Sequence, residues 1–427
     1  MSRRVTRRRF LKAAAAVSMI PWGWRPGILG SNQKLRIGCI GVGGRGAGNV
    51  DGVAHENVVA LCDVETRHLE PMAARFKDAK TFFDYREMIS TSNLDAVVIA
   101  TPDHHHAPAA LRAMLRGMHV YVEKPLTHTV QEARVLARVA AVKRLVTQMG
   151  TQNHRHPVNL EAFEILRSGM LGAVREVHVI TDRPGNWWKQ GQTRPTETPA
   201  IPDTLKWDLF LGPAADRPYH GAYHPFHWRG WWDFGCGAVG DMAIHLMDLA
   251  VWALELDAPE RVTSKGPPVL AESGPVWMES RFEFPAKGSR PAVDVFWYEG
   301  TAKPPEDIAK DLPMNGSLFI CDEGRLAVNH TVWLKTLPEE RWATRPVPTQ
   351  PPSIGHHREW LNAIKNGGRA SCDFAYAGPF TEAVLLANVA YRTGKTVVWD
   401  RDGLTAKGLP EAKRLIAKDY RPGWGVQ

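Results

Sequence analysis

Three glycines in one short stretch have the spacing of a dinucleotide-binding turn. An apolar strand candidate, residues 35–40, runs directly into G-x-G-x-x-G over residues 41–46, and a helix can follow. Glycines there allow a tight bend and let the backbone approach a pyrophosphate at a helix N-terminus. The next apolar run, residues 57–62, is followed by Asp63, at the distance where a ribose-binding carboxylate is expected. The spacing therefore predicts a nicotinamide dinucleotide site.

The acidic residue also bears on which nucleotide binds. A carboxylate repels a 2′-phosphate, so Asp63 favours NAD over NADP. Arg45 and Arg67 weaken this preference, because either side chain could reach a phosphate. We expect NAD, with NADP as the alternative.

Three other residues could support hydride transfer. Oxidation of an alcohol needs a base for the hydroxyl proton and a charge that holds the developing oxyanion. Lys124 directly follows an apolar strand candidate, where its ammonium could polarise or protonate a carbonyl oxygen. Asp241 and His245 are four residues apart in a helical pattern and would share one face. Imidazole suits proton transfer near neutral pH, and Asp241 could orient it or bind a substrate hydroxyl; a helix-surface pair is the alternative.

A segment after residue 183 is rich in tryptophan, histidine and tyrosine. Aromatic rings pack on the apolar faces of sugars, while histidine and arginine bind hydroxyl groups. The expected substrate-binding residues are His224, Trp228, Arg229 and Trp232. Packing of these rings in a core is the alternative. Histidines at 104–106, 154 and 156 invite a metal interpretation, but metal sites need convergent ligands and usually a carboxylate or thiolate, so no metal is predicted.

The elements that must position these groups begin with a regular alternation of strands and helices. Strands are expected at 35–40, 58–62, 81–83, 96–100, 120–122 and 145–148, and helices at 47–55, 66–76, 85–90, 105–117, 129–142 and 157–168. Apolar strands that alternate with helices indicate a doubly wound parallel sheet. Its ligands bind beyond the carboxyl ends of the strands, where the glycine turn, residues 101–106 and residues 123–125 fall.

The remainder of the chain is typical of a second domain with its own sheet. Strands are expected at 276–284, 292–298, 317–321, 325–328 and 396–400, and helices at 240–254, 357–365 and 378–391. We therefore predict an α/β protein with a leader (1–30), a Rossmann domain (31–150), a substrate-binding domain (151–400) and a C-terminal tail (401–427). A helix within 371–395 could pack back on the Rossmann domain.

Composition excludes several classes of protein. The net charge is +8, and six of the positive charges lie in the first 12 residues, at positions 3, 4, 7, 8, 9 and 12. A basic face for nucleic acid is therefore not predicted. No apolar run approaches the roughly 18 residues of a membrane span. Five scattered cysteines without C-x-x-C pairs argue against disulfides or a zinc-thiolate site.

The leader has a distinct pattern of its own. Residues 6–12, Thr-Arg-Arg-Arg-Phe-Leu-Lys, are similar to a twin-arginine export signal, and a short alanine-rich apolar stretch follows. The sequence thus predicts export as a folded protein to the periplasm or cell envelope. A disordered basic arm is the alternative.

Taken together, these motifs resemble the glucose–fructose oxidoreductase / inositol dehydrogenase (Gfo/Idh/MocA) family. Beyond the glycine turn, the matching segments are Thr101-Pro102, His106, Glu123-Lys124-Pro125, Asp241-x-x-x-His245 and residues 371–374 with Glu382-Ala383. The segments 206–214 and 228–235 resemble an exported branch of it. The resemblance implies an N-terminal Rossmann domain and a C-terminal α/β domain with an open, mostly antiparallel sheet that often mediates homo-oligomers. It implies that Lys124, Asp241 and His245 are catalytic, and that the cofactor contacts Gly41, Gly43, Gly44, Arg45, Gly46, Asp63, Thr101, Pro102, His106, Glu123 and Lys124.

The expected activity is oxidation of a CH–OH group of a sugar, sugar derivative or polyol by tightly bound NAD(P). An exported enzyme has no free nucleotide pool, so the nucleotide should return to its starting state in each cycle. Two alternatives remain. One is a redox-neutral glycosidase that oxidises, eliminates, hydrates and reduces again. The other is a non-catalytic carbohydrate-binding protein, because fold does not determine function.

Overall fold

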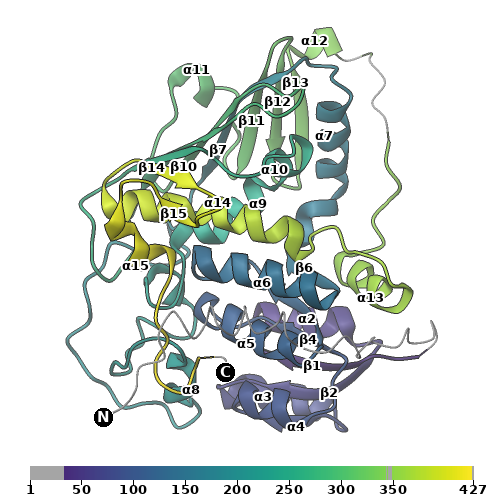
Figure 1. Cartoon of the computed structure of the whole chain (residues 1–427), viewed down its shortest axis with the longest axis vertical. Coiled ribbons are helices and arrows are strands. Elements are labelled where there is room, and N and C mark those ends of the chain that lie inside the picture. The colour runs from purple at the N-terminus through teal and green to yellow at the C-terminus, as the bar shows by residue number, and fades with distance from the viewer. Residues whose placement is uncertain (1–32, 343, 345–348, 426–427) are drawn as a thin grey trace.

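The structure is a computed structural model that describes residues 33–342, 344 and 349–425. The expected leader, with its twin-arginine pattern, lies outside the described residues, as do the last two residues of the tail. Two sheets organise the chain, and the helices α6 and α14 lie between them (Figure 1). The predicted division into an N-terminal Rossmann sheet and a second, C-terminal sheet is confirmed.

The N-terminal sheet has six parallel strands in the order β3-β2-β1-β4-β5-β6. They are β1 Arg36–Ile40, β2 Asn57–Cys62, β3 Lys80–Phe82, β4 Ala96–Ile99, β5 His119–Glu123 and β6 Thr147–Gly150. Every residue of β4 and β5 is buried, as expected for strands covered by helices on both faces. The strand order reverses between β1 and β4, and ligands of such sheets bind at this point.

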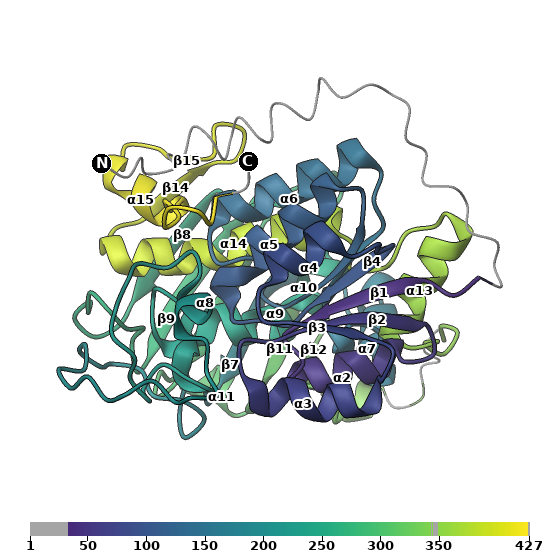
Figure 2. The same cartoon turned by 90° about the horizontal axis from the view of Figure 1, so that it is seen from below.

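Helices cover both faces of this sheet (Figure 2). They are α2 Arg45–Val53, α3 Thr66–Arg75, α4 Tyr85–Thr91, α5 Asp103–Leu115 and α6 Val130–Lys143. Helix α13, His356–Asn366, packs on α2 from a distant part of the chain. The expected helices of this domain are present, with ends shifted by one or two residues.

The second sheet has nine strands in the order β13-β12-β11-β7-β10-β9-β8-β14-β15. Only β7 and β10 pair in parallel, so the sheet is mostly antiparallel, as predicted. The strands are β7 Val174–Thr181, β8 Arg261–Lys265, β9 Met278–Phe284, β10 Val293–Glu299, β11 Gly316–Cys321, β12 Arg325–Asn329, β13 Trp333–Leu337, β14 Val397–Asp400 and β15 Thr405–Ala406. The strands β7, β8, β13 and β15 were not predicted from the sequence. Strands β8, β13 and β15 are short, and the eight residues of β7 mix polar and apolar side chains without strict alternation.

The remaining helices connect the sheets. They are α7 Pro157–Arg167, α8 Trp207–Leu211, α9 Ile244–Leu246, α10 Asp248–Ala253, α11 Glu306–Ala309, α12 Glu339–Trp342, α14 Phe374–Thr393 and α15 Lys413–Ile416, with short turns η2 Gln152–Arg155, η3 His227–Gly230 and η5 Pro410–Ala412. Helix α14 packs along α6, where Arg134 donates to both carboxylate oxygens of Glu382 at 2.7 and 2.6 Å. Among the described residues, every helix is too short or too polar to cross a bilayer.

The prediction of one regular helix over residues 240–254 is wrong, because the segment is divided into three helical pieces. The segment begins with one π-helical turn, η4 Val239–Ala243, continues as α9 and restarts as α10. A π turn closes i→i+5 hydrogen bonds and therefore rotates the side chains that follow it. Hydrophobic periodicity does not reveal such a turn, because all five of its residues are buried.

Candidate active site

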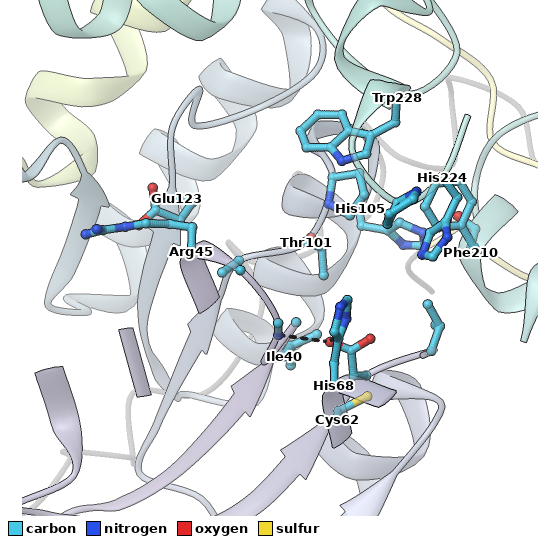
Figure 3. Close-up of a pocket in the computed structure, with 18 of the residues that line it drawn as sticks. Ile40, Arg45, Cys62, His68, Thr101, His105, Glu123, Phe210, His224 and Trp228 are labelled. Carbon is cyan, nitrogen blue, oxygen red and sulfur yellow. Dashed lines mark hydrogen bonds and ion pairs between the residues drawn. The ribbon is translucent and has the colours of Figure 1, made fainter. Parts of the chain in front are cut away.

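One cavity of about 620 Å³ joins the Rossmann sheet to the second domain. It opens over the carboxyl ends of the parallel strands, at the reversal of strand order. Figure 3 shows Arg45 and Glu123 on one side of it and Phe210, His224 and Trp228 on the other. Of the predicted site residues, the cavity is lined by Gly41, Gly43, Gly44, Arg45, Asp63, Thr101, Pro102, Glu123, Lys124, His224, Trp228, Arg229, Asp241 and His245.

The glycine turn has the close backbone packing that its sequence implies. Gly41 has a φ of +75°, which L side chains rarely adopt. A Cβ on Gly46 would lie 1.9 Å from the Gly41 carbonyl oxygen, so only glycine lets α2 begin this close to β1. The bare backbone between them faces the cavity, as an approaching pyrophosphate requires.

Asp63 lines the cavity and also forms hydrogen bonds with the glycine turn. Its Oδ2 accepts hydrogen bonds from the backbone N–H of Val42 at 2.8 Å and of Gly43 at 3.3 Å. The ring Nδ1 of His68 lies 3.6 Å from the same oxygen, and the hydrogen bond to Asp63 raises the pKa of His68. The carboxylate thus stands where a ribose-binding group is needed and also orders the loop beside it.

The two arginines that could have recognised a 2′-phosphate are both directed at carboxylates. Arg67 donates to Glu65 at 2.8 and 3.1 Å, and Arg45 Nε lies 3.2 Å from Glu123 Oε1. Glu123 also accepts from Asn49 at 2.9 Å. This arrangement agrees with the preference that Asp63 indicates.

A charged cluster occupies the opposite end of the cavity. The Nζ of Lys124, at the end of β5, donates to Asp241 Oδ1 at 2.6 Å and to its backbone oxygen at 3.2 Å. Arg229 Nε lies 3.5 Å from the same carboxylate oxygen. Burial raises the pKa of Asp241, but the positive charges of Lys124 and Arg229 outweigh it and lower the pKa to about 2. Asp241 is therefore ionised and fixes the lysine ammonium in the cavity wall.

His245 joins this cluster from α9. Burial, and then the charge of Lys124, lower the pKa of His245 well below its usual value, so the ring is neutral near pH 7. Its Nδ1 is buried and has no hydrogen-bond partner among the residues that the structure describes. A neutral imidazole has one unprotonated ring nitrogen, and because His245 lines the cavity it can accept a proton from a ligand there. Asp241 lies in the π turn and His245 in the helix that follows it, and both line the cavity.

Aromatic rings form the wall beside the cluster. The Arg229 guanidinium lies between Phe226 and Trp228, 4.4 and 4.3 Å from their ring centres. His224 faces the same space, and its burial lowers the pKa of this histidine to about 4. Trp232, expected to be part of this wall, instead lines a separate cavity and donates its indole N–H to the Leu270 carbonyl.

His106 and Gly46, both expected to contact cofactor, lie behind the cavity wall. The ring nitrogens of His106 are each 2.8 Å from a backbone oxygen, that of Pro125 and that of Thr101. His106 therefore ties the loops after β4 and β5 to each other. It positions Thr101 and Lys124 without facing the ligand space.

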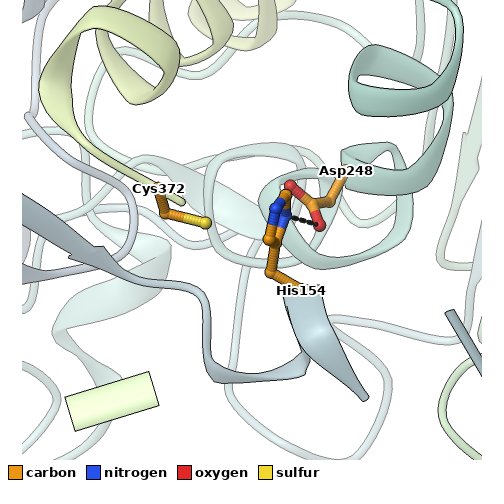
Figure 4. Close-up of side chains that lie close together, drawn as sticks. All are labelled: His154, Asp248 and Cys372. Carbon is orange, nitrogen blue, oxygen red and sulfur yellow. Dashed lines mark hydrogen bonds and ion pairs between the residues drawn. The ribbon is translucent and has the colours of Figure 1, made fainter. Parts of the chain in front are cut away.

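A second group of potential metal ligands is buried away from the cavity. His154, Asp248 and Cys372 meet between α10, α14 and η2 (Figure 4). Asp248 Oδ2 is 2.8 Å from His154 Nδ1, and its Oδ1 accepts from the Tyr376 hydroxyl at 2.6 Å. Burial raises the pKa of the Cys372 thiol well above its usual value. Since both carboxylate oxygens are already engaged, we interpret this group as a hydrogen-bond network.

Several lining residues were not found from the sequence. They are Cys62, His68, Phe83, Asp84, Tyr85, Gln152, Asn153, Leu209, Phe210, Phe226 and Trp424. Gln152 and Asn153 directly follow β6, so the rule that ligands bind at strand ends could have indicated them. Trp424 is near the C-terminus, and no local pattern connects it to the Rossmann domain.

Comparison with known proteins agrees with this architecture. Residues 35–151 match the profile described as "Oxidoreductase family, NAD-binding Rossmann fold", and residues 158–284 match "Oxidoreductase family, C-terminal alpha/beta domain". The WlbA dehydrogenase from Bordetella pertussis, solved with NADH and UDP-GlcNAcA, superposes with a TM-score of 0.62 at 19% identity, over 86% of this chain and 98% of that one. That likeness concerns the fold alone.

Curated relatives share a shorter stretch. Inositol 2-dehydrogenase 4 from Saccharopolyspora erythraea is 35% identical over 154 residues, which are 35% of this chain and 45% of that protein. Glycosyl hydrolase family 109 protein 2 from Shewanella sp. (strain ANA-3) is 30% identical over 152 residues, 33% of either chain. The match thus spans less than half the length of these relatives. Because the Rossmann profile and the C-terminal domain profile match successive parts of this chain, the chain belongs to the Gfo/Idh/MocA oxidoreductase family.

Proposed function

We propose that the protein is an NAD-dependent oxidoreductase that acts on a CH–OH group of a sugar, sugar derivative or polyol. The observation that carries the proposal is that one cavity joins the glycine turn and Asp63 to the cluster of Lys124, Asp241 and His245. The bare turn suits a pyrophosphate, and the carboxylate suits a ribose without a 2′-phosphate. The residues present therefore fit NAD.

The chemistry divides among these side chains in a simple way. A bound NAD would supply the hydride acceptor for oxidation of the carbinol carbon. The His245 imidazole, which lines the cavity, accepts the hydroxyl proton, and the Lys124 ammonium stabilises the negative charge that develops on the oxygen. Asp241 holds the lysine in place through a contact of 2.6 Å. The products are a ketone or lactone, a reduced nicotinamide and one proton on the imidazole.

The test begins with natively purified protein, which is denatured and analysed for released nucleotide. We expect NAD or NADH, and then substrate-dependent NADH formation with a panel of inositols, aldoses and sugar nucleotides. Lys124→Ala should abolish turnover, while Lys265→Ala, at an exposed lysine on β8, should not. Protein that neither carries nor takes up any nicotinamide nucleotide would favour the non-catalytic carbohydrate-binding alternative. Release of NADP would contradict the role of Asp63.

The redox-neutral glycosidase is a second candidate, supported by the relative named as a family 109 glycosyl hydrolase. The same site would oxidise a ring hydroxyl transiently and later return the hydride to the sugar. Nitrophenyl glycosides distinguish the two activities. Release of nitrophenol with no net change in NADH absorbance supports the glycosidase, whereas stoichiometric NADH supports the dehydrogenase.

We also propose that the protein is exported by the twin-arginine route and forms homo-oligomers through its second sheet. The pattern over residues 6–12 supports the first proposal. Replacing Arg7 and Arg8 by lysine should keep the protein in the cytoplasm in a cell-fractionation assay. Sedimentation of purified protein tests the second, and a monomer would contradict it.

A further inference from the structure

The last described part of the C-terminal tail, residues 417–425, crosses from the second domain to the Rossmann domain. In Figure 1 the yellow chain leaves α15 and descends to a point beside α5 and α8. Arg421 fastens it there, donating to the carboxylates of Asp208 at 2.6 Å and Asp216 at 2.5 Å. Its Nε also donates to the Gly212 carbonyl at 2.9 Å. These contacts fix the tail on α8 and on the segment that follows it.

The last turn of the tail inserts a tryptophan into the wall of the large cavity. Trp424 is only 4% exposed, yet it lines that cavity. The Arg86 guanidinium lies 3.8 Å from its ring centre and donates to the Gly423 carbonyl at 3.2 Å. The rings of Tyr85 and His105 meet it edge-on, at 5.8 and 5.6 Å between centres. Side chains of the Rossmann domain thus pack around Trp424, which belongs to the C-terminal tail.

The position of Trp424 identifies the part of a nucleotide it would meet. Tyr85 and Arg86 follow β3, which pairs with β2 beside Asp63. This is the end of the cavity beyond the expected ribose, and Lys124 and Asp241 belong to the other end. In the dinucleotide orientation that Asp63 implies, the adenosine half lies here. Arg86 covers one face of the Trp424 ring, so a base would meet the part of the ring that lines the cavity. Aromatic side chains pack well against bases.

We propose that Trp424 forms a wall of the adenosine site and that the C-terminal tail retains the bound nucleotide. The inference rests on the proposed function and extends it to a part of the chain that lies outside both family profiles. In an exported enzyme such a tail would slow the loss of a nucleotide that no free pool outside the cytoplasm could replace.

The test compares Trp424→Ala with Trp187→Ala, which removes an indole that is 53% exposed and lies outside the cavity. Protein is stripped of nucleotide, and the dissociation constants of NAD and of ADP-ribose are measured by calorimetry. Trp424→Ala should weaken both ligands by the same factor, roughly tenfold or more, because ADP-ribose retains the adenosine half. Trp187→Ala should change neither. Trp424→Phe should restore most of the affinity, and Arg421→Ala should speed release of NAD in stopped flow.

The possible outcomes distinguish a failure of the proposed function from a failure of the role assigned to the tail. Wild-type protein that binds neither ligand overturns the proposed function and this inference with it. If wild-type protein binds both and Trp424→Ala binds them equally well, the role of the tail is refuted while the proposed function stands. If Trp424→Ala fails to fold, as judged by circular dichroism, Trp424→Phe and Arg421→Ala decide. Unchanged affinity and release rates in both variants refute the proposal.

Discussion

Replacing Asp241 by asparagine should destabilise the folded protein by about 2 kcal/mol at neutral pH. The substitution keeps the shape of the side chain but removes the charge that lies 2.6 Å from Lys124 Nζ and 3.5 Å from Arg229 Nε. In the folded protein the pKa of Asp241 is about 2, against an ordinary value of 3.8. Each unit corresponds to about 1.4 kcal/mol of preference for the ionised form, so the lowered pKa gives this magnitude.

The pH dependence has a definite sign. Because the pKa is lower in the folded state, the stabilisation is complete above the unfolded value of 3.8 and disappears as the pH falls through about 2. The difference between wild type and Asp241→Asn should therefore be constant from about pH 8 to pH 5 and shrink only below about pH 4. Urea unfolding at equilibrium, followed by tryptophan fluorescence at several pH values, measures it.

A matched control is available on the surface. Asp322 bonds Arg175 at 2.8 Å, but both side chains are largely exposed, so Asp322→Asn should leave the urea midpoint nearly unchanged. The reasoning is refuted if Asp241→Asn is as stable as the wild type at pH 7. A difference that already declines between pH 8 and pH 5 would also refute it, since another group would then be titrating.

Three further predictions concern the site and its glycine turn. His245→Asn should lower turnover at least about 100-fold in steady-state kinetics, with NAD affinity kept within about threefold, because it removes only the proton acceptor. Asp63→Ala should weaken NAD more than NADP in calorimetric titrations; an equal loss for both would contradict its assigned role. Gly46→Ala should abolish nucleotide binding, because its Cβ would lie 1.9 Å from a backbone oxygen. The control is Gly48→Ala, at an exposed position on the same helix, which should raise the melting temperature because alanine favours the helix more than glycine does.

The alternation of strands and helices could be read from the sequence because it is a local property. Both faces of β4 and β5 are buried, so β4 is a continuous apolar run and β5 has an apolar centre between His119 and Glu123. The glycine turn and Asp63 follow their strands directly. Parallel strands place their carboxyl ends at one edge, and therefore the sequence also indicated that Lys124 would lie near the glycine turn.

Contacts between distant segments could not be predicted in this way. The π turn before His245 leaves no trace in hydrophobic periodicity, because the whole segment is buried. Trp228 and Trp232 are four residues apart in one segment, yet Trp228 lines the large cavity and Trp232 lines a separate one. Residue type alone does not record the direction of a side chain in an irregular segment.

The amino-acid sequence by itself determined the order of elements in the Rossmann domain, the nucleotide turn and the identity of the groups that could do chemistry, since each depends on neighbours along the chain. Only the tertiary structure decided that Lys124 and Asp241 lie 2.6 Å apart, that His106 braces loops behind the cavity, and that Trp424 returns to the Rossmann domain. These contacts join residues far apart in sequence, and the packing of the two domains sets their distances.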